Sequence, residues 1–143
     1  MGRSQKRSGS RWEREAAKEL SKHSGQWRRV PGSGALGTQL GDASLLGDLI
    51  GYYPWFKQPI KAEAKFGYGG SKQITVKRSW IVKIRDQAGR AYAALILKFK
   101  GVYSGDPSAK LIVFDFETWH RMMNDLEDLW EEHLVLLEAH YGR

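Results

Sequence analysis

Two apolar segments in the second half of the chain place the strongest constraint on its fold. Residues 91–100 read AYAALILKFK, and residues 110–117 read KLIVFDFE. Both have the composition of strands that are buried in a sheet. The tetrapeptide between them, GDPS at 105–108, is typical of a turn, so we expect the two strands to be neighbours in one sheet.

The sequence pattern in the rest of the chain predicts three more strands and three helices. The strands are expected at residues 26–30, 49–50 and 60–66, and the helices at about residues 11–23, 74–85 and 118–141. The first helix opens on a capping-box pattern, Ser10 followed by Glu13. Residues 74–85 also fit a strand, but we expect a helix there that ends at Gly89. Together the elements indicate a single α/β domain with a central mixed β-sheet flanked by α-helices.

Length and composition indicate one folded domain. With 143 residues and 41% hydrophobic content, the chain is long enough to bury one core. Residues 1–9 are polar and basic, so we expect a flexible arm there and the folded domain at 10–143. No apolar stretch is long enough to span a bilayer, and the first residues lack the apolar region of a secretory signal. The absence of cysteine fits a reducing compartment, so we expect a cytoplasmic (intracellular) protein with no membrane partner.

Charge is distributed unevenly along the chain. Residues 1–116 carry 21 Lys and Arg against nine Asp and Glu, a net charge of +12, whereas residues 117–143 carry two against seven, a net charge of −5. A basic surface of this kind attracts the phosphates of nucleic acid. The sequence therefore favours a polyanion-binding body and an acidic last helix that lies away from the polyanion.

Three charged residues could meet at one end of the expected sheet. In a strand, residues two apart point the same way, so Glu63 and Lys65 share a face. Asp48 opens the preceding strand and reaches the same place if the two strands pair. Carboxylate oxygens of this kind suit Mg²⁺ or Mn²⁺. The alternative is structural, because an E-x-K pattern is common on solvated strands and Asp after Gly is common in turns.

The order of four short motifs resembles a known family. ERE within RWEREAAKEL, then RVPGSG, GDLI and AEAK, follow one another as in the archaeal-type Holliday junction resolvases, which belong to the PD-(D/E)xK nuclease superfamily. The resemblance runs from about residue 11 to residue 116. It implies a restriction-endonuclease-like fold, a homodimer, metal-dependent hydrolysis of DNA phosphodiesters, and recognition of four-way junctions by shape.

The resemblance also assigns roles to individual residues. Asp48 and Glu63 match the metal-binding carboxylates of the family, and Lys65 matches its catalytic lysine. Glu13 matches the helix glutamate near the metal, and Ser33 matches a loop serine near the scissile phosphate. Two alternatives remain open, because Asp42 stands in a similar Gly-Asp setting and Glu13 also fits a capping role.

Basic residues near these motifs are expected to hold DNA. The resemblance places Arg14 and Arg29 near the substrate. We also expect phosphate contacts from Arg28, Lys72 and Lys77, which carry little base information.

Other signals argue against further chemistry. GSGALG at 32–37 lacks the helix and acidic residue of a dinucleotide site, and no Walker A lysine follows it, so no nucleotide cofactor is expected. The four histidines show no metal-ligand spacing and are expected at the surface or an interface. The aromatic residues could stack on opened bases, but packing in the core or a dimer contact is favoured. They are Tyr52, Tyr53, Trp55 and Phe56.

The sequence thus predicts a homodimeric, Mg²⁺-dependent endonuclease that resolves four-way junctions, in DNA recombination or repair, with Mn²⁺ as a substitute. The resemblance is compatible with an archaeal, viral or phage origin. The alternatives are a sequence-specific or mismatch nuclease of the same superfamily, because fold does not fix function, and a non-catalytic DNA-binding protein.

Overall fold

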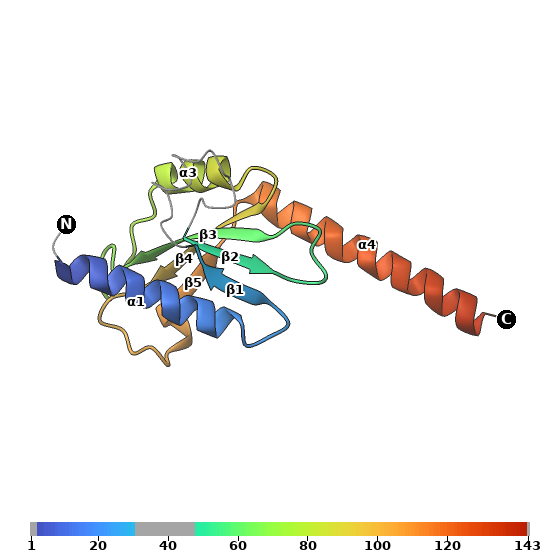
Figure 1. The fold of residues 1–143 in the computed structure, drawn as a ribbon, viewed down its shortest axis with the longest axis horizontal. Helices are drawn as coiled ribbons and strands as arrows, with labels where there is room; N and C mark the ends of the chain where they lie inside the picture. The colour runs from blue at the N-terminus through green and yellow to red at the C-terminus, as the bar shows by residue number, and fades with distance from the viewer. Residues whose placement is uncertain (1–2, 31–47, 143) are drawn as a thin grey trace.

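The computed structural model describes residues 3–30 and 48–142, with side chains from residue 7 onward. At its centre is one five-stranded sheet in the order β1-β2-β3-β4-β5. The strands are β1 (Gln26–Arg29), β2 (Leu49–Tyr52), β3 (Ile60–Phe66), β4 (Tyr92–Lys98) and β5 (Lys110–Val113). The helices are α1 (Arg3–Leu20), α3 (Arg78–Ala88), the short 3-10 helix η2 (Pro107–Ala109) and α4 (Phe116–Tyr141) (Figure 1). The predicted α/β fold with a mixed sheet flanked by helices is confirmed.

The sheet is mixed because one connection crosses over. Strands β3 and β4 pair in parallel and are joined through α3, whereas β1–β2, β2–β3 and β4–β5 are antiparallel. A parallel pair needs such a crossover, which a helix commonly provides. The neighbouring position predicted for the two apolar segments, now β4 and β5, is confirmed.

Helices cover the two faces of the sheet with two separate cores. Trp12 and Ala16 of α1 pack against Ala62 of β3 and Ile96 of β4. The opposite face of β4 packs against α3, mainly through Trp80, Ile84 and Ala88. Alternation along β4 therefore sends apolar side chains to both faces, which is why β4 is buried along nearly its whole length.

Strand β5 and helix α4 are less buried than their composition predicts. β5 lies at the edge of the sheet, and its residues Leu111 and Ile112 are 41% and 50% exposed. Helix α4 packs on the body only through its first turns, where Thr118, Met122 and Asp125 are buried. The rest of α4 projects away from the body as a long arm (Figure 1).

Several boundaries differ from the sequence-based expectation. Helix α1 begins at Arg3, so it includes most of the segment expected to be a flexible arm, and Ser10 lies inside the helix rather than at its cap. Arg, Gln and Lys are good helix formers, and one internal Gly costs only about 1 kcal/mol relative to Ala. The helix expected at 74–85 begins later, at Arg78. Gly89 ends it as predicted, with a φ of 58° that favours glycine.

Candidate active site

The pairing of β2 with β3 brings Asp48 to the middle of β3. Leu49 pairs with Ala62, and the backbone N–H of Asp48 donates to the carbonyl of Ala62 over 3.0 Å. The Asp48 carboxylate in turn accepts a hydrogen bond from the backbone N–H of Ala64, at 2.9 Å. These two bonds join Asp48 to the residues on either side of Glu63 and so hold Asp48 next to it. The predicted meeting of Asp48 with the E-x-K segment is therefore present in the structure.

Glu63 is a buried carboxylate with one committed and one uncommitted oxygen. Its side chain is only 7% exposed. One oxygen, Oε1, lies 3.1 Å from the ammonium of Lys65 and 3.4 Å from that of Lys83. The other, Oε2, is buried and has no hydrogen-bond partner among the described residues. Burying a carboxylate oxygen without a partner costs free energy, so this atom is poised for a ligand.

Lys65 is held from two sides. Its ammonium is paired with Glu63 and lies 4.9 Å from the ring centre of Trp80 and 5.6 Å from that of Tyr68. The two rings contact each other edge to face, with centres 4.6 Å apart. Cations are attracted to aromatic faces at such distances, so the rings stabilise one position of the ammonium.

Glu13 adds a second carboxylate beside Asp48. It projects from α1 and forms an ion pair with Arg29 of β1, at 2.9 Å. Burial raises the pKa of Glu13, and the neighbouring Asp48 carboxylate raises it further, while Arg29 and Arg14 lower it. The structural alternative for Glu13 is wrong, because Ser10 lies within α1 and forms no capping box.

The carboxylates fit a divalent cation in their chemistry. Carboxylate oxygens are the ligands that Mg²⁺ and Mn²⁺ prefer, and Glu63 presents a buried oxygen that nothing in the described ranges satisfies. Within those ranges, no three acidic or histidine side chains lie together as a ready-made metal cluster. Glu13 and Glu63 are instead held by Arg29 and Lys65. Asp48 and Glu63 are the residues best placed to hold the ion.

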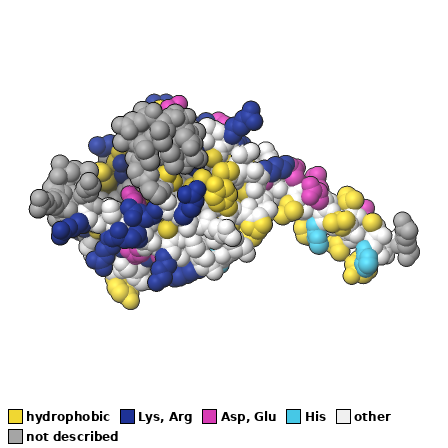
Figure 2. All heavy atoms as spheres, viewed as in Figure 1, with side chains coloured by type: hydrophobic (Ala, Val, Ile, Leu, Met, Phe, Trp, Pro, Cys, Tyr) yellow, Lys and Arg dark blue, Asp and Glu magenta, His cyan; other side chains and the backbone are white. Residues whose placement is uncertain are grey.

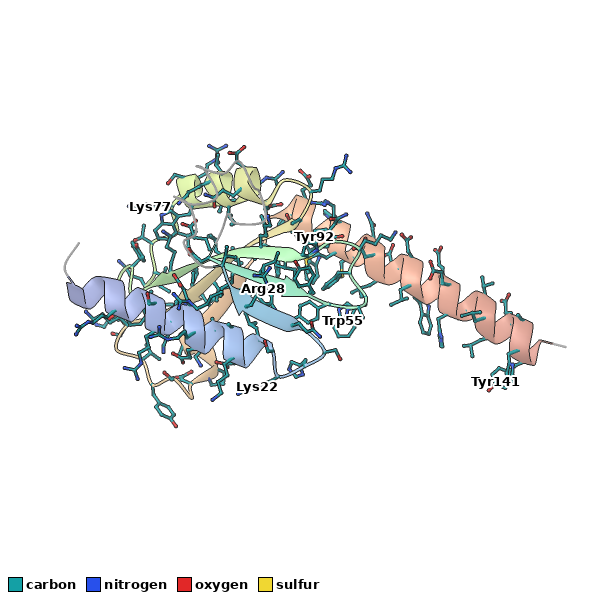
Figure 3. All side chains as sticks on the ribbon, viewed as in Figure 1. Lys22, Arg28, Trp55, Lys77, Tyr92 and Tyr141 are labelled. Atoms are coloured by element: carbon teal, nitrogen blue, oxygen red, sulfur yellow. The ribbon has the colours of Figure 1, made fainter. Side chains whose placement is uncertain are left out.

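The predicted DNA-binding residues lie on the surface of the body. Arg14, Arg28, Lys72 and Lys77 are exposed, whereas Arg29 is half-buried in its pair with Glu13. Figure 3 labels Arg28 on β1 and Lys77 ahead of α3. Figure 2 shows Lys and Arg side chains gathered over the body.

Three residues at the site were missed by the sequence reading. They are Tyr68, Trp80 and Lys83, which approach Glu63 and Lys65 from the loop after β3 and from α3. One signal was available, because Lys83 follows Trp80 by three residues and so shares its face of the helix. This face of α3 covers β3 because of the crossover connection, and the spacing of Trp80 and Lys83 alone does not reveal that connection.

Some expectations fall elsewhere. Ser33 and Asp42 lie outside the described residues. Tyr53 and Phe56 pack against the core beside Tyr92, which confirms the packing alternative for these two aromatic residues. All four histidines are exposed, three of them on α4. In the described part of the chain, no helix is both long and apolar enough to cross a membrane.

Comparison with known proteins agrees with this geometry. A family model described as "Phage putative PDDEXK endonuclease" matches residues 4–139, a range that contains every candidate residue above. No curated protein matches the sequence. PDDEXK nucleases generally use divalent metal ions, and a phage family is compatible with the expected viral or phage origin. Because the match covers most of its length, the chain belongs to this phage PDDEXK endonuclease family.

Proposed function

We propose that this chain is a Mg²⁺-dependent, structure-selective endodeoxyribonuclease that resolves four-way DNA junctions, with Mn²⁺ as a substitute. The observation that carries the proposal is the hydrogen bond from the Ala64 N–H to the Asp48 carboxylate, which fixes Asp48 beside Glu63 and Lys65. Two carboxylates and an ammonium are thereby brought together. Such a group suits the hydrolysis of a phosphodiester, because negative charge builds on the phosphate during the reaction.

Each residue of the site has a separate task in this proposal. Asp48 and Glu63 hold the divalent cation, which when bound activates water and stabilises charge on the phosphate. Lys65, kept in place by Glu63 and Trp80, donates hydrogen bonds to the attacking water or to a phosphate oxygen. Glu13 and Arg29 stand beside Asp48 and orient the approach of the DNA backbone.

The proposed preference for four-way junctions rests on the basic charge of the body and on the order of the four sequence motifs. The body is strongly basic, and its exposed Arg and Lys side chains suit phosphates rather than base edges. A protein that reads shape through phosphates binds with little base preference, and its affinity falls steeply with salt. A homodimer with two equivalent sites would cut two strands of a nearly twofold-symmetric junction.

The test is cleavage of a four-way junction and of linear duplexes that contain the same sequences, with and without Mg²⁺. We expect paired nicks in the junction only, dependent on the metal. Asp48→Asn should abolish cleavage while junction binding persists. Asp86→Asn, an exposed carboxylate on α3, is the matched control and should cut normally.

Other outcomes select the alternatives. Equal cleavage of the linear duplexes would assign a sequence-specific or mismatch nuclease of the same family. Metal-independent binding without any cleavage, in Mg²⁺ and in Mn²⁺, would assign a non-catalytic DNA-binding protein.

A further inference from the structure

The distal part of helix α4 is an arm whose side chains are left exposed by the part of the body that the structure describes. From residue 127 to residue 141 every side chain is exposed. Many of these side chains are large and apolar, with exposed fractions of 45% for Leu129, 59% for Trp130, 68% for Leu136 and 75% for Tyr141. Figure 2 shows hydrophobic and histidine side chains along the arm, and Figure 3 labels Tyr141 near its far end. Exposing such an apolar surface to water does not stabilise an isolated soluble helix.

The apolar side chains gather on one face of the arm. At 100° per residue, Leu126, Leu129, Trp130, His133 and Leu137 fall within one broad stripe. A shallow groove of about 430 Å³ runs along this stripe. Glu132 borders this groove, and the other acidic residues of the arm lie on the opposite side of the helix, namely Glu127, Asp128, Glu131 and Glu138. The arm is therefore amphipathic, and its apolar face has the form of an interface.

We infer that this face pairs with the same face of a second copy of the chain, with the two arms antiparallel. The area suffices. Aromatic side chains bury ~150–250 Å² each, so Trp130 and Tyr141, at 59% and 75% exposed, contribute roughly 250 Å². With the leucines of the stripe, each arm offers roughly 500 Å², so two arms together bury about 1,000 Å², the lower bound expected for a specific interface. The exposed part is 15 residues long, or ~22 Å, which gives two arms a long common seam.

Charge narrows the choice of occupant. Residues 127–141 contain five acidic residues and no Lys or Arg, so DNA and anionic membranes would repel the arm. Direction follows from where the bodies sit, because parallel arms would bring the two bodies together at one end of the seam. An antiparallel pair places them at opposite ends, with the far end of each arm beside the helix root of the partner. Two isologous faces also cover each other completely, which a smaller partner would not achieve.

This inference supplies the dimer surface for the proposed function. It rests on that function in one respect only, the requirement for two active sites. The oligomeric state is measured without DNA or metal, so it stands or falls separately from cleavage. An arm-to-arm dimer leaves both sheets and their basic surfaces free to face one junction.

The first experiment compares two substitutions of similarly exposed residues on opposite sides of the arm. Trp130 lies in the apolar stripe and Val135, 64% exposed, lies among the acidic residues. By sedimentation equilibrium of the full chain, we expect a dimer for the wild type and for Val135→Glu. Trp130→Glu should raise the dimer dissociation constant at least ~30-fold, the effect of losing a central aromatic residue. Circular dichroism should show the same fold for all three, because neither residue packs on the body.

Three results would overturn the inference. They are a monomeric wild type at tens of micromolar, a Trp130→Glu variant that dimerises like the wild type, and a Val135→Glu variant that dissociates as readily as Trp130→Glu. A second experiment tests direction, because the chain has no cysteine of its own. Antiparallel arms predict disulfide cross-linking only when Leu126→Cys and Leu137→Cys variants are mixed, whereas parallel arms predict cross-linking within each variant alone.

Discussion

The active-site end of the sheet and the arm of α4 depart from ordinary burial in opposite ways. At the site, Glu63 is a charged residue that is only 6% exposed. On the arm, Leu136 and Tyr141 are apolar residues that are 68% and 75% exposed. Both arrangements oppose stability in an isolated subunit. Departures of this kind are expected where a protein meets something else.

The two regions differ in how the free-energy cost of the buried charge or of the exposed apolar surface is compensated. At the site the chain supplies its own counter-charges, since Lys65 pairs with Glu63 and Arg29 pairs with Glu13. The apolar face of the arm receives no such help from the described part of the body, although Lys57 pairs with Asp128 on its acidic side. The charges of the described site residues are therefore paired within one subunit, whereas the apolar face of the arm requires another molecule.

Among the substitutions that test this difference between the site and the arm, one at Glu63 is expected to have the largest effect. Glu63→Gln removes the charged oxygens that face the ion, and we expect single-turnover cleavage to fall at least ~10³-fold, or about 4 kcal/mol of transition-state stabilisation. The free energy of unfolding should fall by up to about 3 kcal/mol, because Gln keeps the volume but leaves the largely buried Lys65 ammonium without its charged partner. Glu117→Gln, at a carboxylate 67% exposed, is the control. Cleavage within tenfold of wild type would remove Glu63 from the mechanism.

The second effect separates the root of α4 from its arm. Asp125 is buried and accepts hydrogen bonds from the Tyr92 hydroxyl and from the Lys57 backbone N–H, the latter over 2.9 Å. Asp125→Ala leaves two donors without a partner, at ~1–3 kcal/mol each, so urea unfolding should show a loss of about 3 kcal/mol. Asp128→Ala removes only an exposed ion pair with Lys57 and should cost less than about 1 kcal/mol. Equal losses would show that the root is held by charge alone.

The sequence predicted the parts of this molecule that depend on short-range pattern. Alternation along 60–66 placed Glu63 and Lys65 on one face, and the structure confirms it, with Asp48 beside them. The pattern could not reveal that Trp80 and Lys83 approach from α3, because a crossover brings them there from a distance in sequence. It also could not show that the acidic last helix is anchored only at its root. That outcome depends on how far the sheet extends beneath the helix.

A smaller effect tests the rings around Lys65. Tyr68→Leu removes a ring that lies 5.6 Å from the Lys65 ammonium, and exposed cation–π contacts are worth ~0.5–1 kcal/mol. We expect kcat to fall about 2- to 5-fold by that energy, with KM unchanged, since the ring positions Lys65 and does not bind DNA. Tyr68→Phe keeps the ring and should restore the wild-type rate. A loss in Tyr68→Phe equal to that in Tyr68→Leu would assign the effect to the hydroxyl group instead.

The smallest effect concerns the cap that starts α4. The Asp115 carboxylate accepts from the Thr118 N–H at 2.8 Å and pairs with Arg85 at 2.7 Å. Burial by itself raises the pKa of Asp115, but the Thr118 hydrogen bond and the Arg85 charge outweigh it and lower the pKa below its ordinary value of 3.8. Asp115→Ala should cost about 1 kcal/mol at pH 7, as the loss of a helix cap does.

The pH dependence of that loss identifies its source. A carboxylate with a lowered native pKa stabilises the fold fully above its unfolded pKa of 3.8 and loses that contribution as pH falls through the native pKa. The difference between wild type and Asp115→Ala should therefore shrink in acid below pH 3.8. Asp115→Asn keeps a capping oxygen but no charge, so its stability relative to Asp115→Ala should not change over that range. If the wild-type advantage persists in acid, the cap acts through its hydrogen bond and the Arg85 pair adds nothing to the anchoring of the arm.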